Sequence, residues 1–333
     1  MITTPPATAS AAEEPADGYK GWFKPPPIER ADRASVGVGD VRRDDLYSCD
    51  ARMQLAINVA LATARPLLVS GPSGCGKTSL ARFIAWVMSW DIWKLTITSR
   101  TQARDLLYTV DDLKRLQDAR RGATDPTFKS YVVPGVLWWA FDRHSAEQLE
   151  PTASEPIAGD EFCTPEIGAG AVVLLDEIDK ADPDVPNNLL EPLGSYRFSV
   201  PELATGDRKT FEVRAGRAPL VVLTTNNERR LPDAFLRRCV DLPLKWPTRE
   251  ELLRIAAAHL GGRQQVTSDW LNEILDLVCP GGVTPESVGL STAEFLDTGQ
   301  ACAALEVRAR GWAWRELPGI TVRKSTRSED ERE

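Results

Sequence analysis

A glycine-rich turn followed by a lysine and a threonine lies between an apolar run and an amphipathic segment. Residues 66–88 read PLLVSGPSGCGKTSLARFIAWVM, in which Gly71, Gly76, Lys77 and Thr78 fit the spacing G-x-x-x-x-G-K-[ST]. Glycines let a backbone turn back and aim its N–H groups at phosphate oxygens, and the start of the next helix adds a positive dipole end. A lysine at that helix start opposes the dipole, so fold stability alone does not favour it. The pattern therefore predicts a cradle for a triphosphate.

Each side chain of this loop has an expected role. Lys77 reaches the β- and γ-phosphates, and the Thr78 hydroxyl is a ligand of Mg²⁺. Cys75 is either a tolerated small residue, which we favour, or a redox switch, and a chance glycine-rich turn is the alternative for the whole loop. The residues expected to surround the nucleotide are Gly71, Pro72, Ser73, Gly74, Cys75, Gly76, Lys77, Thr78 and Ser79.

The segment AVVLLDEID (171–179) ends in carboxylates. Its continuous aliphatic run is typical of a strand buried on both faces, and ligands bind beyond the carboxyl ends of such strands. Asp176 would hold Mg²⁺, through water, and Glu177 would orient and polarise an attacking water molecule. A solvated helix start is the alternative for this acid pair. Asp179 has either a catalytic or a local capping role.

Polar residues also follow the apolar segment PLVVLTTNN (219–227). Asn226 is placed to hydrogen-bond a γ-phosphate or the attacking water, Asn227 is the competing candidate, and an Asx turn is the alternative for both. The next segment, LPDAFLRRC (231–239), carries Arg237 and Arg238 at the end of a short expected helix. Arginines there usually complement the helix dipole, but their position after the asparagine strand favours phosphate chemistry.

Composition bounds the class of protein. The 333 residues are 42% apolar and 26% charged, which is typical of a globular chain of one or two domains. A net charge of −8 and a pI near 5.1 disfavour binding to nucleic acid through bulk charge. The six scattered cysteines indicate reduced thiols, and the two histidines leave little material for a zinc site or a histidine-based triad.

The location of the protein is predicted from what the chain lacks. The first residues show no basic segment followed by an apolar core, and no apolar run approaches the roughly 18 residues of a membrane span. We therefore expect a cytoplasmic protein without a membrane segment.

Strand-like and helix-like segments alternate along most of the chain. After an expected helix at 51–63 with apolar positions at Leu55, Val59 and Leu61, strands at 66–70, 94–98, 171–175 and 219–224 are each followed by a helix, at 77–90, 102–120, 184–193 and 232–238. This order predicts an α/β fold with a mostly parallel sheet covered by helices on both faces. Segments 196–200 and 209–213 predict a hairpin before the fourth strand.

The pattern changes near residue 246, after which only helices are expected, at 249–260, 267–279 and 291–309. We predict a Pro-rich or disordered segment over 1–34, a nucleotide-binding domain over 35–246, a helical domain over 247–315 and a charged tail over 316–333. The acidic, Pro-rich stretch 146–170 is expected to be an exposed loop. The apolar stretch YVVPGVLWWAF (131–141), with Trp138 and Trp139, is interpreted as core in preference to a partner-binding loop.

These blocks, in this order, resemble the AAA+ ATPases, and in detail the MoxR-type branch. GPSGCGKT is similar to its Walker A motif, VVLLDEIDKAD to its Walker B motif, and VVLTTNNERRLPDAFLRRC to its sensor 1 and arginine-finger block. PGVLWWAF resembles the element that this branch inserts after its second helix, and the hairpin segments resemble its hairpin before sensor 1. The resemblance covers residues 44–305. It implies a P-loop NTPase sheet sandwiched by helices, followed by an all-helical lid.

The resemblance also implies site roles and assembly. It assigns Asn226 as sensor 1 and Arg238, or its neighbour Arg237, as the finger that reaches the γ-phosphate of the next subunit in a hexameric ring. Fingers of this kind contribute about 10³–10⁵ in turnover in GTPases. Members of this family carry a basic sensor 2 residue where this chain has Ser291, in VGLSTAEF. Coupling of the lid to the γ-phosphate therefore depends on another cation or is absent.

The preferred function is Mg²⁺-dependent ATP hydrolysis that remodels or assembles a protein client, with a von Willebrand A-domain partner implied by the resemblance alone. A nucleic-acid motor or loader is disfavoured by the acidic pI and the lack of a basic, aromatic single-strand module. An ATP-gated scaffold in a regulatory or defence complex is favoured by Ser291 and opposed by Glu177 and Arg238. GTP is disfavoured as the nucleotide because the guanine-reading motif N-K-x-D is lacking. A small-molecule kinase is disfavoured because it would leave the arginine-finger block and the helical lid unexplained.

Overall fold

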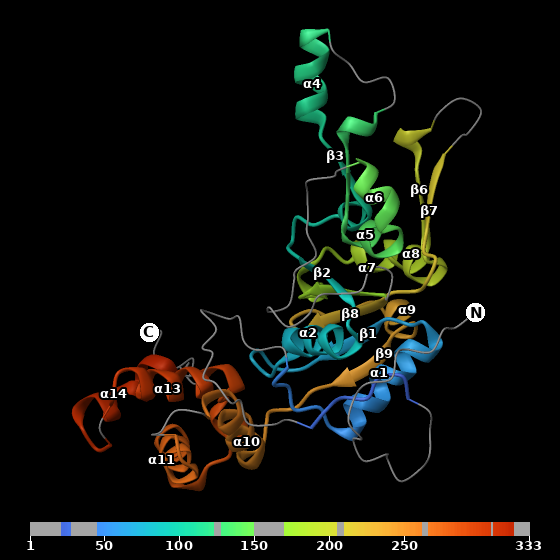
Figure 1. Cartoon of the computed structure of the whole chain (residues 1–333). Coiled ribbons are helices and arrows are strands. Elements are labelled where there is room, and N and C mark those ends of the chain that lie inside the picture. Colours follow the sequence, from blue (N-terminus) through green and yellow to red (C-terminus); the bar gives the residue numbers. More distant parts are fainter. Residues whose placement is uncertain are drawn as a thin grey trace. The chain divides into compact units, whose positions relative to one another are not determined.

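The chain forms two compact units in its computed structural model (Figure 1), which describes residues 21–27, 45–122, 128–149, 170–204, 210–261, 266–307 and 309–322. One, here called the sheet unit, comprises Leu55–Ser70 and Ile84–Pro243. The other, the helical unit, comprises Met1–Gln54, Gly71–Phe83 and Leu244–Glu333. The expectations for residues 1–20, 28–44, 150–169 and 323–333 lie outside the described residues. The exposed loop expected over 146–170 is wrong at its start, because residues 146–149 belong to the helix Arg143–Leu149 and Ala146 is buried.

A five-stranded parallel sheet forms the centre of the sheet unit. Its order is β2-β5-β8-β1-β9, and every residue of β5 and β8 is buried, as expected for strands covered on both faces. The predicted parallel α/β sheet is therefore confirmed. The strands are β1 (Leu67–Ser70), β2 (Asp91–Thr96), β5 (Ala171–Asp176), β8 (Leu220–Thr225) and β9 (Val240–Pro243).

The strand β9 was not predicted. Its sequence VDLP is short, and its last residue is a proline, which has no N–H for a sheet ladder and is tolerated at a sheet edge. The strand is stabilised by pairing with β1. Val240 lies opposite Leu67, and the Val240 N–H donates to the Pro66 carbonyl oxygen at 2.8 Å.

Several of the predicted helices differ in detail from the structure. The one expected at 184–193 forms two helices, Asp184–Asn188 and Leu190–Ser195. Helix α1 (Ala51–Thr63) is present, but Leu55 and Val59 are exposed and Ile57 and Ala60 are the buried apolar residues. The single helix expected at 102–120 is wrong, because the chain there forms α3 (Ala103–Leu107), β3 (Tyr108–Val110) and α4 (Asp112–Arg121).

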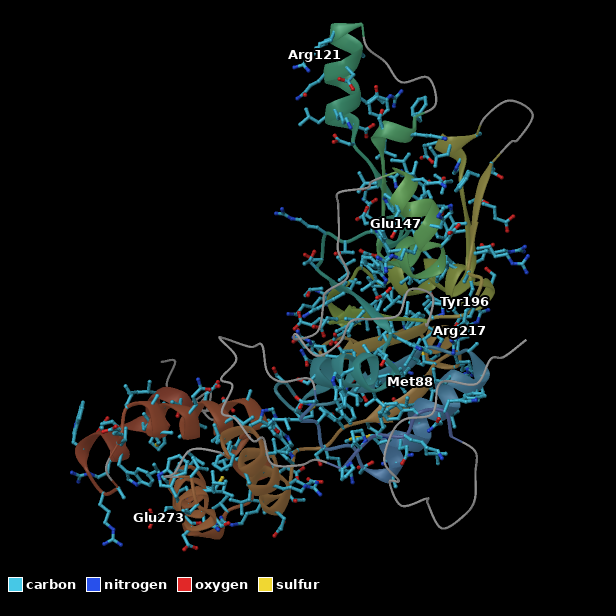
Figure 2. All side chains as sticks on the ribbon, viewed as in Figure 1. Met88, Arg121, Glu147, Tyr196, Arg217 and Glu273 are labelled. Atoms are coloured by element: carbon cyan, nitrogen blue, oxygen red, sulfur yellow. The ribbon has the colours of Figure 1, made fainter. Side chains whose placement is uncertain are left out.

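The interruption of that helix has two causes. Residues of β3 are β-branched or aromatic and pair antiparallel with β4 (Val132–Pro134). Asp111 then caps α4, because its carboxylate accepts the Lys114 N–H at 2.8 Å. No residue of α4 is buried, and Figure 2 shows its side chains projecting around the helix, with Arg121 at its outer end.

The predicted hairpin is confirmed as β6 (Arg197–Val200) and β7 (Phe211–Arg214), which pair antiparallel. In Figure 1 this hairpin and α4 extend from the same end of the sheet unit. Short helices connect these elements: α5 (Val136–Phe141), α6 (Arg143–Leu149), α7 (Asp184–Asn188), α8 (Leu190–Ser195) and α9 (Asp233–Leu236).

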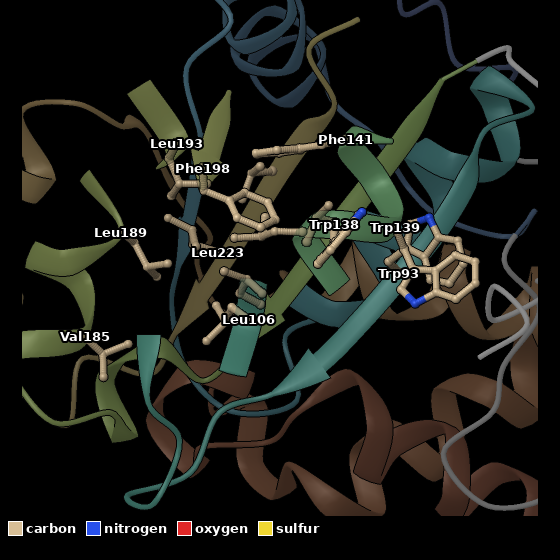
Figure 3. Packing of buried hydrophobic residues seen from close by; sticks show 14 of the residues in the cluster. Trp93, Leu106, Trp138, Trp139, Phe141, Val185, Leu189, Leu193, Phe198 and Leu223 are labelled. Atoms are coloured by element: carbon tan, nitrogen blue, oxygen red, sulfur yellow. The ribbon is translucent and has the colours of Figure 1, made fainter. Parts of the chain in front are cut away.

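The aromatic stretch at 131–141 lies in the core, as predicted. Trp138 is fully buried and Trp139 nearly so, and Figure 3 shows both within the apolar cluster of the sheet unit. Trp139 stacks on Trp93 of β2 at a ring-centroid distance of 5.0 Å, and Trp138 packs edge-on against Phe198 of β6 at 5.7 Å. The hairpin is thereby joined to the sheet through aromatic contacts.

The helical unit contains the three helices expected after residue 246 and two that were not expected. They pack around a second apolar cluster that includes Leu252, Ile274 and Phe295. The last helix continues beyond residue 315, where the charged tail was expected to begin, because Trp314 and Leu317 are buried in this cluster. The helices are α10 (Arg249–Leu260), α11 (Ser268–Val278), α12 (Pro285–Val288), α13 (Thr292–Ala304) and α14 (Trp312–Thr321).

Over the parts of the chain that the structure describes, every helix is too short or too polar to cross a lipid bilayer.

Replacement of Trp138 by alanine should lower the free energy of unfolding by about 3–5 kcal/mol, because it removes a fully buried ring. The change also removes the bond from the Trp138 Nε1–H to the Ser145 hydroxyl. Urea titration followed by circular dichroism measures the effect. The control is Leu116→Ala on α4, where the side chain is 51% exposed and the change should be within about 0.5 kcal/mol. Equal effects of the two substitutions would contradict the placement of Trp138 in the core.

Candidate functional site

The glycine-rich loop follows β1 directly and leads into α2 (Lys77–Met88). Gly74 and Gly76 have φ angles of +74° and +92°, a region that other L-residues rarely adopt. A Cβ on Gly76 would lie 3.2 Å from the Tyr47 ring, and a Cβ on Gly74 would lie 2.5 Å from that of Ser291. The loop glycines are therefore required both by backbone conformation and by close neighbours.

Lys77 is buried, and its ammonium group is turned toward the start of the loop. It donates to the carbonyl oxygens of Gly71 at 2.8 Å and of Pro72 at 2.7 Å. A buried ammonium must be hydrogen-bonded, so these carbonyls hold the charge within the loop. Thr78 is half-buried at the next position. The positions and types of both side chains fit the phosphate and Mg²⁺ roles, which stay predictions.

Asp176 is the last residue of β5, and two groups fix its carboxylate. Its Oδ1 accepts a hydrogen bond from the Thr224 hydroxyl at 2.6 Å, and its Oδ2 lies 3.1 Å from the Lys94 ammonium on the neighbouring strand β2. Asp176 is 8% exposed. A buried carboxylate offers oxygen ligands of the kind that Mg²⁺ prefers, and a metal there would share Oδ2 with the Lys94 ammonium or displace it.

Glu177 leaves the strand in the left-handed conformation, with φ of 63°. Its carboxylate accepts from Lys180 at 2.8 Å, and this hydrogen bond raises the pKa of the exposed Lys180 ammonium. Its backbone N–H donates to the Thr224 hydroxyl at 2.9 Å. A non-glycine residue with positive φ is uncommon and is frequently found at functional sites.

Thr224 was not predicted as a site residue. The sequence LTTNN offered one signal, a hydroxyl residue two positions before Asn226, but a threonine in a strand usually reflects only β propensity. The register that pairs Leu175 with Leu223 brings Asp176 level with Thr224, so the contact depends on strand pairing.

Asp179 has the capping role that was one of its two expected functions. Its Oδ2 accepts the backbone N–H groups of Asn226 at 3.1 Å and Glu228 at 2.9 Å. Asp179 is 2% exposed, and its other oxygen has no hydrogen-bond partner among the described residues. The carboxylate thus fixes the turn that carries Asn226. Asn227 in that turn has φ of 60° and is exposed, whereas Asn226 is half-buried.

Arg237 and Arg238 are exposed and lie at the amino-terminal ends of the parallel strands, opposite to the ends that carry Asp176. They precede β9, whose first residue pairs with the first residue of β1, whereas Asp176 is the last residue of β5. Both arginine carbonyl oxygens accept from the Arg65 guanidinium, and the Arg238 Nη1 donates to the Leu190 carbonyl oxygen at 3.0 Å. The arginines are therefore not brought together with Asp176, Glu177 or Asn226 of the same chain.

Ser291, where the resemblance implies a basic sensor 2 residue, caps α13. Its hydroxyl accepts the Glu294 N–H at 3.2 Å and donates to the Glu294 carboxylate at 2.7 Å. This capping box satisfies the helix start. Its Cβ lies close enough to Gly74 that only a glycine fits there. The serine thus has a packing role against the loop.

Tyr47, another residue beside the loop that was not predicted, stacks on Phe83 of α2 at 5.4 Å. Burial raises the pKa of the Tyr47 hydroxyl and of the Cys75 thiol, and it raises the pKa of Cys49 to about 12. The five described cysteines are free thiols. A protonated, partly buried thiol is a poor nucleophile, which supports the interpretation of Cys75 as a tolerated small residue.

Histidines do not form part of the site. His259 contacts the Leu46 carbonyl oxygen at 3.0 Å, and His144 contacts the Gln148 side chain at 3.0 Å. Within the described ranges, His, Cys, Asp and Glu side chains do not gather in threes as metal ligands would.

Replacement of Gly74 by alanine should weaken nucleotide binding and stability, because the new methyl group meets Ser291 and the backbone is strained. Gly281→Ala is the matched control: its φ is also +74°, but nothing lies within 4 Å of the added Cβ. Each substitution carries a strain of about 1 kcal/mol, and only Gly74→Ala adds the steric contact. Adding Ser291→Gly to Gly74→Ala should recover part of the loss, since glycine is an acceptable N-cap. Calorimetric titration with ATP and urea unfolding measure both effects, and equal losses in the two single variants would contradict the contact.

Alkylation of the described cysteines by iodoacetamide should be slow at pH 7–8 in a Cys163→Ser variant. The thiolate is the reactive species, and a raised pKa lowers its fraction until the pH approaches that pKa. Raising the pH toward 10 or unfolding in urea should therefore accelerate the reaction strongly. Peptide mass spectrometry after timed quenching locates the modified thiols. Rapid labelling of Cys75 at pH 7 would contradict this expectation.

Comparison with known proteins gives three findings. The profile of the AAA domain (dynein-related subfamily) matches residues 66–239. No curated protein matches the chain. The crystal structure of a protein from Cytophaga hutchinsonii, provisionally assigned as an ATPase, is similar with 17% sequence identity and a TM-score of 0.38, over 79% of this chain and 74% of that chain. The region matched by the profile contains the glycine-rich loop, Asp176, Glu177, Asn226, Arg237 and Arg238.

Proposed function

Because the chain belongs to the AAA domain family, in its dynein-related subfamily, and so binds a nucleotide, we propose that it hydrolyses ATP with Mg²⁺ to remodel or assemble a protein client. One observation carries this proposal. Three neighbouring parallel strands end at the same edge of the sheet, where β1 leads into Gly71, β5 ends at Asp176 and Glu177 follows, and β8 leads into Asn226.

In the proposed reaction a water oxygen attacks the γ-phosphorus of ATP and forms a new P–O bond. The bond from that phosphorus to the oxygen bridging the β-phosphate breaks, which releases ADP and inorganic phosphate. Glu177 orients the water and accepts its proton, and Asn226 hydrogen-bonds the γ-phosphate or the water. Lys77 and the N–H groups of the loop neutralise the phosphates. Asp176 and Thr78 offer the oxygen ligands that Mg²⁺ prefers, and the bound metal would neutralise charge that develops on the phosphates.

The placement of the arginines supports catalysis between subunits. Arg237 and Arg238 lie at the edge of the sheet opposite to Asp176 and Glu177, and strands rise by about 3.3 Å per residue. We propose that an arginine there serves the γ-phosphate of a neighbouring subunit and not that of its own chain. We therefore propose a ring, with six subunits as in the MoxR-type branch that the sequence resembles.

The client is proposed to be a protein, with a von Willebrand A-domain protein as a partner. This part of the proposal depends on the resemblance to the MoxR-type branch. We propose that a client contacts the exposed helix α4 and the hairpin β6–β7, which lie outside the central sheet at one end of the sheet unit. An ATP-gated scaffold is the second candidate, favoured by Ser291 in place of a basic residue.

Mixing two inactive variants tests catalysis between subunits. Glu177→Gln keeps the arginines but loses the proton acceptor, and Arg238→Ala keeps Glu177 but loses the finger. Each variant alone should bind ATP while its turnover falls by about 10³-fold. Mixed rings should regain activity at the junctions that pair an intact Glu177 with an intact Arg238. Phosphate release, measured over a wide range of protein concentration, is the readout.

The control for the arginine is Arg230→Ala, an exposed residue of the preceding turn that pairs with Asp233, and it should keep wild-type turnover. Loss of activity in Arg237→Ala in place of Arg238→Ala would assign the finger to Arg237. Tight ATP binding with negligible turnover at every concentration of the wild-type protein would favour the scaffold.

A further inference from the structure

Thr224 connects the two carboxylate-bearing residues at the end of β5. Its hydroxyl donates to the Asp176 Oδ1 at 2.6 Å and accepts the Glu177 N–H at 2.9 Å. Thr224 is fully buried, on the strand between β5 and β1. A threonine hydroxyl has a single proton, so Thr224 donates only to Asp176 and acts as an acceptor toward Glu177.

This bond determines which oxygen of Asp176 faces a cation. Oδ1 is held by Thr224, whereas Oδ2 lies 3.1 Å from the Lys94 ammonium. A carboxylate that serves a metal is commonly held by a hydrogen bond from a neighbouring side chain, which fixes its orientation. Thr224 provides such a bond to Oδ1, which leaves Oδ2 as the oxygen that would bind a metal, beside the Lys94 ammonium or in its place.

The same hydroxyl also holds Glu177 in its uncommon conformation. With φ of 63°, Glu177 turns the chain at the end of β5, and its N–H reaches Thr224 in that conformation. Strained residues persist where their surroundings fix them. A side chain without a hydroxyl would remove one hydrogen-bond partner from Asp176 and one from Glu177 at once.

We infer that Thr224 is a positioning residue for ATP hydrolysis, which orients Asp176 toward Mg²⁺ and holds Glu177 in its catalytic conformation. The inference depends on the proposed ATPase function. Thr224 acts through these two residues and does not itself contact the nucleotide in this proposal.

The test compares Thr224→Val, which keeps the shape and loses the hydroxyl, with Thr224→Ser, which keeps the hydroxyl. Calorimetric titration with a non-hydrolysable ATP analogue, in excess Mg²⁺ and in EDTA, gives the gain in affinity due to Mg²⁺. In Thr224→Val this gain and kcat should each fall by about 10–100-fold, while affinity in EDTA is unchanged. Thr224→Ser should restore both.

The control is Thr298→Val in the helical unit, where a buried hydroxyl donates to the Glu294 carbonyl oxygen and not to a carboxylate. It should leave the Mg²⁺-dependent gain at the wild-type value, whatever its effect on stability. If Thr224→Val does not fold, Thr224→Cys provides a small side chain with only a weak donor, and the same loss is expected.

The outcomes separate two kinds of failure. A wild-type chain that gains no affinity from Mg²⁺ and releases no phosphate would overturn the proposed function together with this inference. A wild-type chain that hydrolyses ATP, with a Thr224→Val variant of unchanged Mg²⁺ dependence and kcat, would overturn the role of Thr224 alone. A loss in Thr224→Ser as large as in Thr224→Val would also overturn it, because the hydroxyl would then not be responsible.

Discussion

Parallel hydrogen bonding between β1, β8 and β5 is the constraint on which the candidate site depends. In a parallel sheet, neighbouring strands have their carboxyl ends at the same edge, so residues far apart in the chain meet there. Ser70 at the end of β1 pairs with Thr225, and Leu175 near the end of β5 pairs with Leu223. Because β5 and β8 are buried along their whole length, their side chains are closed to a ligand, and polar residues can reach one only where these strands end.

Buried polar groups at this edge are satisfied mainly by one another. The Thr224 hydroxyl serves Asp176 and Glu177, and the Asp179 carboxylate serves the turn at Asn226 and Glu228. Unsatisfied polar groups in such an environment cost about 1–3 kcal/mol each. The hydrogen bonds of Thr224 and of Asp179 therefore stabilise this end of the sheet. They also fix the segments that carry the proposed catalytic groups.

Several elements could be predicted from local sequence because their signals are local. The apolar run before Gly71, the glycine spacing and the helical pattern from Lys77 lie within one short segment, and the aromatic stretch with Trp138 has a composition that favours burial. Predictions failed where a distant partner decides the outcome. The strand β9 exists because it pairs with β1, and the expected helix at 102–120 is interrupted because β3 pairs with β4. Exposure of Leu55 and Val59 likewise depends on what packs against α1.

The sequence by itself determined the fold class, the order of the motifs and the residue types offered to a nucleotide. Only the tertiary structure decided that Thr224 bridges Asp176 and Glu177, that Asp179 caps the Asn226 turn and that Ser291 packs against Gly74. It also placed the two arginines at the sheet edge opposite to the carboxylates. The physical reason is that spacing along the chain specifies local conformation, whereas these contacts join residues that become neighbours only through strand register and helix packing.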